Sequence, residues 1–376
     1  QWDYYLNNLS IHANSGLNST NLNYILKTRI SGETNFQEYI NSESQSNSWF
    51  NALDLKYRFS NQFQMELKNE TNRHQVNTFE QRSLTGYDQI RIENLFMLKA
   101  LYQISDFGLN GLIRNSWVDG KWHPLIPMLG LEYSGWKHQG FTVFARAARN
   151  FRLPTLNDLY YQPGGNPNLR PEKGLSFDLG SGFSRQLEHA ALQLKVNAFY
   201  SPITDWIVWL PTYYGGWEPQ NVKKVISSGI ELSGSIMGSL KQLTYNIQAN
   251  YALSNSINQG EATHWADQSI GKQLPYIPRH SANSLISLQY KRINLNYNWN
   301  YYSKRFTTTS NQTLNPLDEL YAYFMNDVSL GREFHLGKNR LNADFKIFNL
   351  FNEKYRTVLQ RMMPKRNYSL TISYTF

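Results

Sequence analysis

The chain has 376 residues, a formal net charge of +9 and no cysteine, and 15% of its residues are aromatic. The lack of cysteine excludes disulfides, thiolate metal sites and a cysteine nucleophile. No run of about 18 apolar residues is present, which excludes a transmembrane helix. Lys and Arg are spread along the chain without a basic helix or an RNA-binding signature, so nucleic acid is not expected as a partner.

Alternation of apolar and polar residues with a period of two predicts strands that are apolar on one face and wet on the other. The closing stretch is the clearest, because Tyr368, Leu370 and Ile372 fall on one face and Ser369 and Thr371 on the other. About 17 such strands are predicted, over residues 4–13, 21–30, 49–60, 63–68, 89–104, 107–118, 125–133, 141–148, 175–183, 192–200, 230–236, 243–253, 282–290, 293–301, 320–334, 341–351 and 367–376.

The connections between these strands alternate between long and short. Outer-membrane barrels have short periplasmic turns and longer extracellular loops, and several predicted strands reach the roughly 9–11 residues that a tilted strand needs to cross a bilayer. The pattern therefore predicts an all-β fold, a transmembrane antiparallel β-barrel, with its C-terminus on the short-turn side. The long connections are expected at residues 34–47, 71–88, 150–174, 203–222, 254–279, 303–318 and 352–364.

Sequence motifs for enzymatic chemistry are missing. Gly271-Lys272 is followed by Gln273 and lacks the first glycine of a phosphate-binding loop. Neither a Gly-x-Ser-x-Gly nucleophile elbow nor a His-Glu-x-x-His zinc motif occurs, and the 8 His are scattered. An enzymatic role, a cofactor and a metal site are therefore not predicted.

Two segments have compositions that suit a binding loop. Residues 150–172 contain four prolines and Gly164-Gly165, which predict a structured, turn-rich loop; the alternative is a rigid connector. Residues 206–217 are rich in Trp and Tyr and are a candidate face for a large ligand or a protein partner; the alternative is an aromatic girdle with loop packing. The candidate ligand-binding residues are Tyr160, Tyr161, Asn166, Trp206, Trp209, Tyr213, Tyr214, Trp217 and Trp265.

Three short motifs, taken with the terminal Phe376, resemble those of the TonB-dependent receptors of Gram-negative outer membranes. Their order and spacing fit that family, and the resemblance covers the whole chain as barrel. Phe151-Arg152-Leu153-Pro154 is similar to the family's FRAP box, Asn166-Pro167-Asn168-Leu169 with Pro171-Glu172 to its NPNL box, Asn349-Leu350-Phe351-Asn352 to its penultimate-strand motif, and Tyr374 with Phe376 to its barrel-closing C-terminal signal. Without the resemblance, the third motif would be interpreted as a strand end with an anchoring aromatic residue.

The resemblance implies a 22-stranded barrel around an N-terminal plug. If the closing strand is the last of 22, the first predicted strand is the sixth. Residues 1–376 are then the C-terminal part of such a barrel, without the plug, and a separate N-terminal fragment is expected to carry the plug and the first five strands. TonB is expected to act through that plug. Outer-membrane lipids are a further expected partner, and a surface-exposed lipoprotein is a candidate one.

The resemblance also implies a function, which is the binding of a scarce, large nutrient at the outer face and its import with energy supplied through TonB. Haem receptors of this type usually carry a His between the first two motifs, and this chain has none there. The compact loop Tyr160–Gly165 resembles that of corrinoid receptors of Bacteroidetes, so cobalamin or another corrinoid is the expected ligand. A ferric siderophore is the alternative within the family.

Two other classes of protein stay open. A passive porin would share the barrel but let its substrate pass without TonB. A soluble β-sandwich or propeller with a binding role would share the alternating strands and would be stable without detergent.

Overall fold

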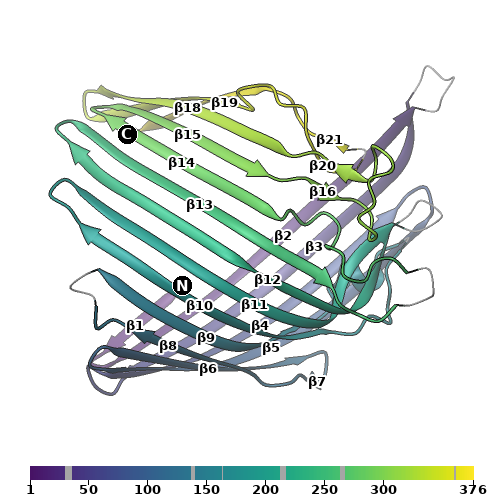
Figure 1. Ribbon diagram of the computed structural model, residues 1–376, viewed down its shortest axis with the longest axis horizontal. Helices are drawn as coiled ribbons and strands as arrows, with labels where there is room; N and C mark the ends of the chain where they lie inside the picture. The colour runs from purple at the N-terminus through teal and green to yellow at the C-terminus, as the bar shows by residue number, and fades with distance from the viewer. Residues whose placement is uncertain (30–35, 137–139, 163, 212–216, 263–266, 360) are drawn as a thin grey trace. The chain divides into compact units, whose positions relative to one another are not determined.

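The computed structural model describes residues 1–29, 36–136, 140–162, 164–211, 217–262, 267–359 and 361–376 (Figure 1). In this part of the chain nearly all regular structure is β-strand, and the helix α1 covers only Leu156–Tyr160. No described helix is long and apolar enough to cross a membrane.

Eighteen of the described strands belong to one hydrogen-bonded sheet. These strands are β1 (Trp2–Leu6), β2 (Leu9–Arg29), β3 (Phe36–Arg58), β4 (Phe63–Glu80), β5 (Thr85–Ile104), β6 (Phe107–Val118), β7 (Lys121–Trp122), β8 (Ile126–Tyr133), β9 (Phe141–Arg152), β10 (Glu172–Gln186), β11 (Ala190–Pro211), β12 (Trp217–Leu240), β13 (Leu243–Asn258), β14 (His280–Tyr290), β15 (Ile293–Tyr302), β18 (Tyr323–Leu336), β19 (Asn339–Phe348) and β22 (Asn367–Thr375). Two small hairpins stand beside it, formed by β16 (Arg305–Phe306) with β17 (Glu319–Leu320) and by β20 (Arg356–Val358) with β21 (Arg361–Met362).

The chain forms two compact units. Unit 1 comprises residues 1–131, 146–176 and 203–223, and unit 2 comprises residues 132–145, 177–202 and 224–376. In unit 1, β1 to β6 pair antiparallel in chain order. In unit 2, β12, β13, β14, β15, β18, β19 and β22 pair antiparallel in that order.

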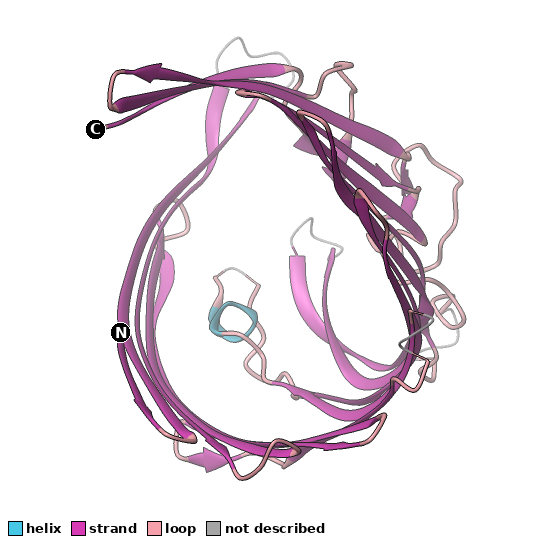
Figure 2. Cartoon of the chain, turned by 90° about the vertical axis from the view of Figure 1, so that its left-hand side faces the viewer, coloured by secondary structure: helices cyan, strands magenta, loops and turns pink. Residues whose placement is uncertain are grey.

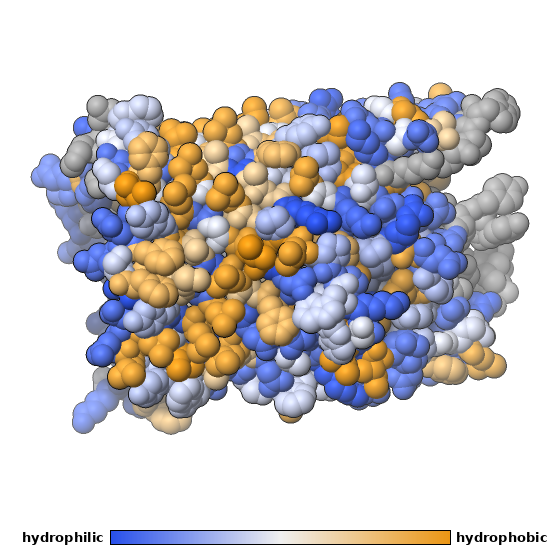
Figure 3. Space-filling view, turned by 90° about the horizontal axis from the view of Figure 1, so that it is seen from below, coloured by the Kyte–Doolittle hydropathy of each residue, from blue (hydrophilic) through white to orange (hydrophobic). Residues whose placement is uncertain are grey.

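The two faces of the unit 1 sheet differ in chemistry. On one face, called here the outer face, Ile11, Leu55, Leu67, Leu98 and Ile113 lie in register across β2 to β6. The opposite, inner face carries charged side chains at the same height. Leu67, Leu98 and Ile113 of this row are exposed, and Ile11 and Leu55 are half-buried. Figure 3 shows apolar side chains gathered over much of the visible surface. A face of this kind needs hydrocarbon or another apolar partner against it.

Unit 2 repeats this arrangement. The row Leu288, Leu295 and Leu330 faces one side of β14, β15 and β18, whereas Asn296, one residue along β15, donates a hydrogen bond from Nδ2 to Ser329 Oγ at 3.3 Å on the other side. The alternation that predicted these strands therefore corresponds to two real faces, one apolar and one polar.

Several sequence-based boundaries were wrong. The first two predicted strands are β1 and a long β2, separated by a tight turn in which Asn7 has a φ of 49°. Much of the predicted loops 34–47, 71–88 and 203–222 is strand, because β3, β4, β5, β11 and β12 continue well beyond their apolar stretches. In β3, β4 and β5 both faces are largely polar there, and in β11 residues 206–210 are apolar on both faces, so the alternation that marks a strand disappears while the backbone pairing continues. The predicted strand 320–334 is interrupted, with Leu320 in β17 and β18 starting at Tyr323.

Candidate functional site

The segment from Asn150 to Glu172 is a folded connector between two strands. β9 ends at Arg152 and β10 begins at Glu172, so the two ends of the predicted loop are in fact strand. Thr155 is the N-cap of α1: its Oγ1 accepts the backbone N–H of Asp158 at 3.0 Å, and Asp158 Oδ2 accepts the N–H of Thr155 at 2.9 Å. This reciprocal capping box fixes the start of the short helix.

Asp158 also contacts residues outside α1. Its side chain is buried, and its Oδ1 accepts the indole N–H of Trp209 in β11 at 2.8 Å. Arg152 lies between two carboxylates, with its Nη2 3.9 Å from Asp158 Oδ2 and its Nε 3.3 Å from Glu172 Oε2. Glu172 Oε1 in turn accepts the backbone N–H of Ile207 at 2.8 Å. The first motif and the end of the second are thus tied to each other and to β11.

The second motif, residues 166–172, forms hydrogen bonds with β11 and β12. Asn166 Oδ1 accepts the N–H of Asn168 at 3.0 Å, which closes an Asx turn, and Asn166 Nδ2 donates to the carbonyl of the buried Pro219 at 3.2 Å. Arg170 donates from Nε and Nη2 to Asp205 Oδ1 at 2.9 and 2.6 Å. The side chain of Asn221 accepts the N–H of Arg170 and donates to the carbonyls of Arg170 and Asp205.

Gly164 shows how closely this segment approaches its neighbour. Its φ is +123°, a region that side-chain-bearing residues rarely adopt, and a Cβ placed there would lie 2.4 Å from the carbonyl oxygen of Trp217. Glycine is therefore required at this position.

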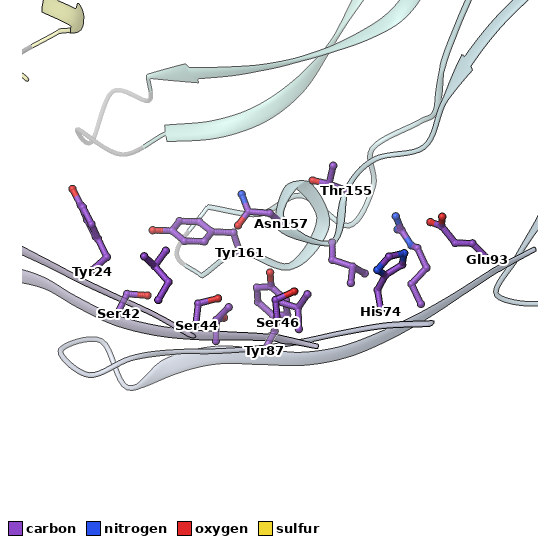
Figure 4. Close-up of a pocket in the computed structure, with 15 residues that line it drawn as sticks. Tyr24, Ser42, Ser44, Ser46, His74, Tyr87, Glu93, Thr155, Asn157 and Tyr161 are labelled. Atoms are coloured by element: carbon purple, nitrogen blue, oxygen red, sulfur yellow. The ribbon is translucent and has the colours of Figure 1, made fainter. Parts of the chain in front are cut away.

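A cavity of about 540 Å³ separates the α1 segment from the inner face of unit 1 (Figure 4). The α1 segment stands off the strands (Figure 2) on the side toward which the inner-face side chains point. The cavity is lined mostly by neutral polar and aromatic side chains. The lining comprises Leu22, Tyr24, Ser42, Ser44, Ser46, His74, Val76, Thr78, Tyr87, Arg91, Glu93, Thr155, Leu156, Asn157 and Tyr161.

Two tyrosines form the aromatic part of this lining close to α1. The ring of Tyr161 meets the Trp209 ring edge to face at a centroid distance of 5.9 Å, and Tyr87 lies 6.1 Å from Tyr160. Burial raises the pKa of the Tyr161 phenol, which keeps it neutral. Arg91 is the one Arg or Lys among the described lining residues, and its Nη1 donates to the carbonyl of Pro154 at 2.9 Å. The described lining thus suits a ligand with amide and apolar surfaces.

The structure brings together some of the sequence-predicted site residues. Tyr160 lies in α1, Tyr161 follows it, and Trp209 and Asn166 hold this segment in place. Trp206 and Trp209 are in β11 and Trp217 begins β12, so the prediction that they lie in a loop was wrong: the aromatic residues stand on two strands that extend beyond the apolar face. Tyr213, Tyr214 and Trp265 lie outside the described residues.

The wall of the cavity was not predicted from the sequence. Tyr24, Tyr87 and His74 were not singled out, and neither was the run Ser42, Ser44 and Ser46, whose period of two could have indicated a polar strand face. Among the described residues there is no cluster of three or more His, Asp or Glu side chains that could hold a metal ion.

The third motif closes the end of β19. Asn349 is 2% exposed and adopts a left-handed φ of 52°. Its Nδ2 donates to the carbonyls of Glu353 at 2.9 Å and Pro364 at 3.4 Å, its Oδ1 accepts the N–H of Glu353 at 2.7 Å, and its own N–H donates to Asp327 Oδ1 at 2.8 Å. Asn352 Oδ1 accepts the N–H of Arg366 at 3.1 Å. This motif is structural.

Comparison with known proteins decides the family. A family model described as "TonB dependent receptor-like, beta-barrel" matches residues 1–350. The chain belongs to this family. Its members are receptors and transporters of the Gram-negative outer membrane rather than enzymes, which confirms the predicted fold class, family, location and non-enzymatic character.

Relatives in sequence are other TonB-dependent receptors. The chain is 25% identical over 283 residues to a protein named vitamin B12 transporter BtuB from Photobacterium profundum, covering 74% of this chain and 42% of that one. It is also 25% identical over 244 residues to a protein of the same name from Vibrio vulnificus, covering 62% of this chain and 34% of that one. The chain therefore spans less than half the length of these relatives.

Solved TonB-dependent receptors share the fold. The siderophore receptor PiuA from Acinetobacter baumannii matches with a TM-score of 0.70 at 14% identity, covering 98% of this chain and 62% of that chain. The copper transporter OprC matches with a TM-score of 0.68 at 12% identity, covering 96% and 62%. Receptors with different cargo thus share this TonB-dependent barrel, and the fold alone does not name a ligand.

Proposed function

We propose that this TonB-dependent receptor binds cobalamin or another corrinoid at its outer end and imports it with energy delivered through TonB. The observation that carries the proposal is the cavity between α1 and β2 to β5. Its tyrosines can lie against a flat, largely apolar ring system, and its serine, threonine and asparagine side chains can bond to amide groups. The cavity is smaller than a whole corrinoid, so it would hold one edge of the molecule.

The sequence relatives support the same ligand class, since the two described above carry the name of a vitamin B12 transporter. Because the chain covers less than half of them, we propose that a further polypeptide segment supplies the plug and the remaining strands, and that TonB acts through that plug. A surface-exposed lipoprotein partner remains a prediction.

A ferric siderophore is the second candidate. The net charge of +9 favours an anionic ligand, and several structural neighbours are named as siderophore receptors. The cavity argues against it, because Arg91 is the one Arg or Lys among the described lining residues and its guanidinium donates to the carbonyl of Pro154.

The experiment measures the affinity for cyanocobalamin by isothermal titration calorimetry of the detergent-extracted receptor. Tyr87→Ala and Tyr161→Ala should each weaken binding roughly 5-fold or more, as expected for an aromatic residue in a ligand contact. Tyr290→Ala is the matched control, because Tyr290 is at the short-turn end of β14 and should leave affinity unchanged. Unchanged cobalamin affinity in both cavity variants would contradict the proposal, and binding of a ferric siderophore that these variants weaken would favour the second candidate.

Uptake distinguishes the receptor from a passive pore. Transport of the bound nutrient by intact cells should disappear when TonB is removed. Uptake that persists without TonB would show a porin instead.

A further inference from the structure

His74 is the one histidine among the described residues that line the cavity. It lies on the inner face of β4, where it pairs in register with Ser48 of β3 on one side and with Arg91 of β5 on the other. Figure 4 shows its ring rising from the strand toward the α1 segment, with Tyr24 toward the opposite end of the cavity. The side chain is half-buried, so a molecule in the cavity can reach it.

Two contacts fix the orientation of the His74 ring. Its Nδ1 forms a hydrogen bond of 2.9 Å with the hydroxyl of the buried Ser48, and the ring of Phe50 meets it edge to face at a centroid distance of 5.4 Å. Among the described residues, no further hydrogen bond or ion pair involves this imidazole. In the tautomer whose Nδ1 donates to Ser48 Oγ, Nε2 carries the lone pair. That lone pair is left for a ligand.

A neutral imidazole held in this way has the arrangement of a metal ligand. A metal-bound histidine almost always donates its other ring N–H to a neighbouring group, which fixes the ring and raises the basicity of the ligating nitrogen. Ser48 is that neighbouring group for His74. The corrin ring already supplies the equatorial ligands of its cobalt, so a single protein nitrogen is enough to occupy an axial position.

The other ligating side chains of the cavity suit cobalt less well than His74. Burial raises the pKa of the Tyr161 phenol, and a protonated phenol is a poor metal ligand. Glu93 offers a carboxylate, but carboxylates favour harder ions, whereas imidazole favours the later first-row transition metals. His74 is therefore the residue of the described lining that would bind a corrinoid through its metal.

We propose that His74 Nε2 coordinates the cobalt of a corrinoid that enters the cavity with water in an axial position. This inference rests on the proposed function. The cobalt–oxygen bond to water breaks, a cobalt–nitrogen bond to Nε2 forms, and the water leaves. The cobalt keeps its oxidation state and no proton moves, because Nε2 of this tautomer carries none. The receptor thereby prefers an aquo corrinoid to one whose axial positions are both held by stronger ligands.

The test compares aquocobalamin with cyanocobalamin, each titrated into the detergent-extracted receptor by calorimetry. In cyanocobalamin, cyanide and the benzimidazole hold both axial positions, so this corrinoid reports binding in the cavity without coordination. Aquocobalamin should bind roughly tenfold or more tightly than cyanocobalamin. Its visible spectrum should also shift on binding, as it does when free imidazole replaces the axial water.

Two variants separate the ligand from the group that positions it. His74→Gln keeps a polar side chain of similar size but cannot supply Nε2, so the ratio of the two affinities should fall to about one and the spectral shift should disappear. Ser48→Ala removes the group bonded to Nδ1. It should lower the affinity ratio, but the shift should still appear at saturating aquocobalamin because the ligand is intact.

Electron paramagnetic resonance identifies the coordinating atom directly. Cobinamide lacks the benzimidazole, so any axial nitrogen in the complex comes from the protein. After reduction of the bound cobinamide to its cobalt(II) form, the spectrum should show splitting by an axial nitrogen. The splitting pattern should change when the histidines of the receptor are labelled with nitrogen-15, and it should be missing in His74→Gln.

His12→Gln is the matched control. His12 is also an inner-face histidine of unit 1, in register with Asp54. Its Nδ1 is likewise bonded to a side chain, with Asp3 Oδ1 at 2.6 Å, but it does not belong to the described lining of the cavity. The affinity ratio and the spectral shift should both be those of wild type.

The possible failures can be told apart. Equal affinity of wild type for the two corrinoids, without a spectral shift, would overturn the coordination by His74 and leave the proposed function standing. A shift that persists in His74→Gln would assign the coordination to another residue and would also overturn the inference. Failure of both corrinoids to bind would overturn the proposed function and this inference with it.

Discussion

The carboxylate of Asp158 and the indole of Trp209 are joined by a hydrogen bond of 2.8 Å between residues 51 positions apart. One residue is in α1 and the other in β11, and no sequence motif contains both. Because Asp158 also caps α1 through Thr155, this single buried side chain positions the segment that forms one wall of the cavity.

Asp158→Ala should loosen the 155–171 segment. The substitution leaves the Trp209 indole and the Thr155 N–H without their acceptor, which should cost about 1–3 kcal/mol locally. Hydrogen exchange should become faster in residues 155–171 while the rest of unit 1 keeps its protection. Glu188→Ala, at an exposed short turn, is the control; equal exchange in both variants would show that Asp158 has no such role.

Glu80 should make stability depend on pH. It accepts hydrogen bonds from the hydroxyl and N–H of Ser83, each at 2.5 Å, and from the N–H of Asn41 at 3.1 Å, and these lower its pKa from 4.5 to about 2. A lowered folded-state pKa contributes stability that is present above about pH 4.5 and is lost as the pH falls toward 2.

Thermal unfolding of wild type and Glu80→Gln in detergent checks this pH dependence. The variant should melt at a lower temperature at pH 7, and the difference should shrink as the pH falls through this window. A difference that does not change with pH would contradict the assignment.

Leu295 and Asn296 separate the lipid face from the inner face of unit 2. Leu295→Arg should cost about 1–2 kcal/mol, because the charge enters the apolar face two residues from the short-turn end of β15, where the cost is lower than at the bilayer midplane. Asn296→Arg should be tolerated, because Asn296 points to the polar side, where it bonds to Ser329. Urea-dependent folding into lipid vesicles measures both, and equal costs would argue against the membrane-facing assignment.

Asn349→Leu should destabilise the end of β19. Leucine fills a similar volume but removes the donor to Glu353 and Pro364 and the acceptor for the Glu353 N–H, and it disfavours the left-handed φ. The expected loss is about 2–4 kcal/mol, visible as a lower temperature of unfolding in detergent. Phe351→Leu, at an exposed neighbouring position, should change it little.

Much of the fold could be predicted from the sequence wherever one strand face meets lipid and the other meets water. Leu53, Leu55 and Tyr57 alternate with polar residues because only their side faces hydrocarbon, so a local pattern of period two predicts both the strand and its orientation. Where a strand continues into water on both sides, as β3 does over Ser42 and Ser44, this contrast is absent. The predicted loops at 34–47 and 71–88 were wrong for that reason.

The sequence by itself determined the strand alternation and the motifs that indicate a TonB-dependent receptor, because both are encoded in short stretches of neighbouring residues. Only the tertiary structure decided which distant residues meet. It placed Asp158 against Trp209, formed the cavity wall from Tyr24 and Tyr87, and aligned Asn51 and Asn94 with Thr71 between them. Strand register sets these contacts, and register depends on hydrogen bonds between strands far apart in sequence, which no local pattern contains.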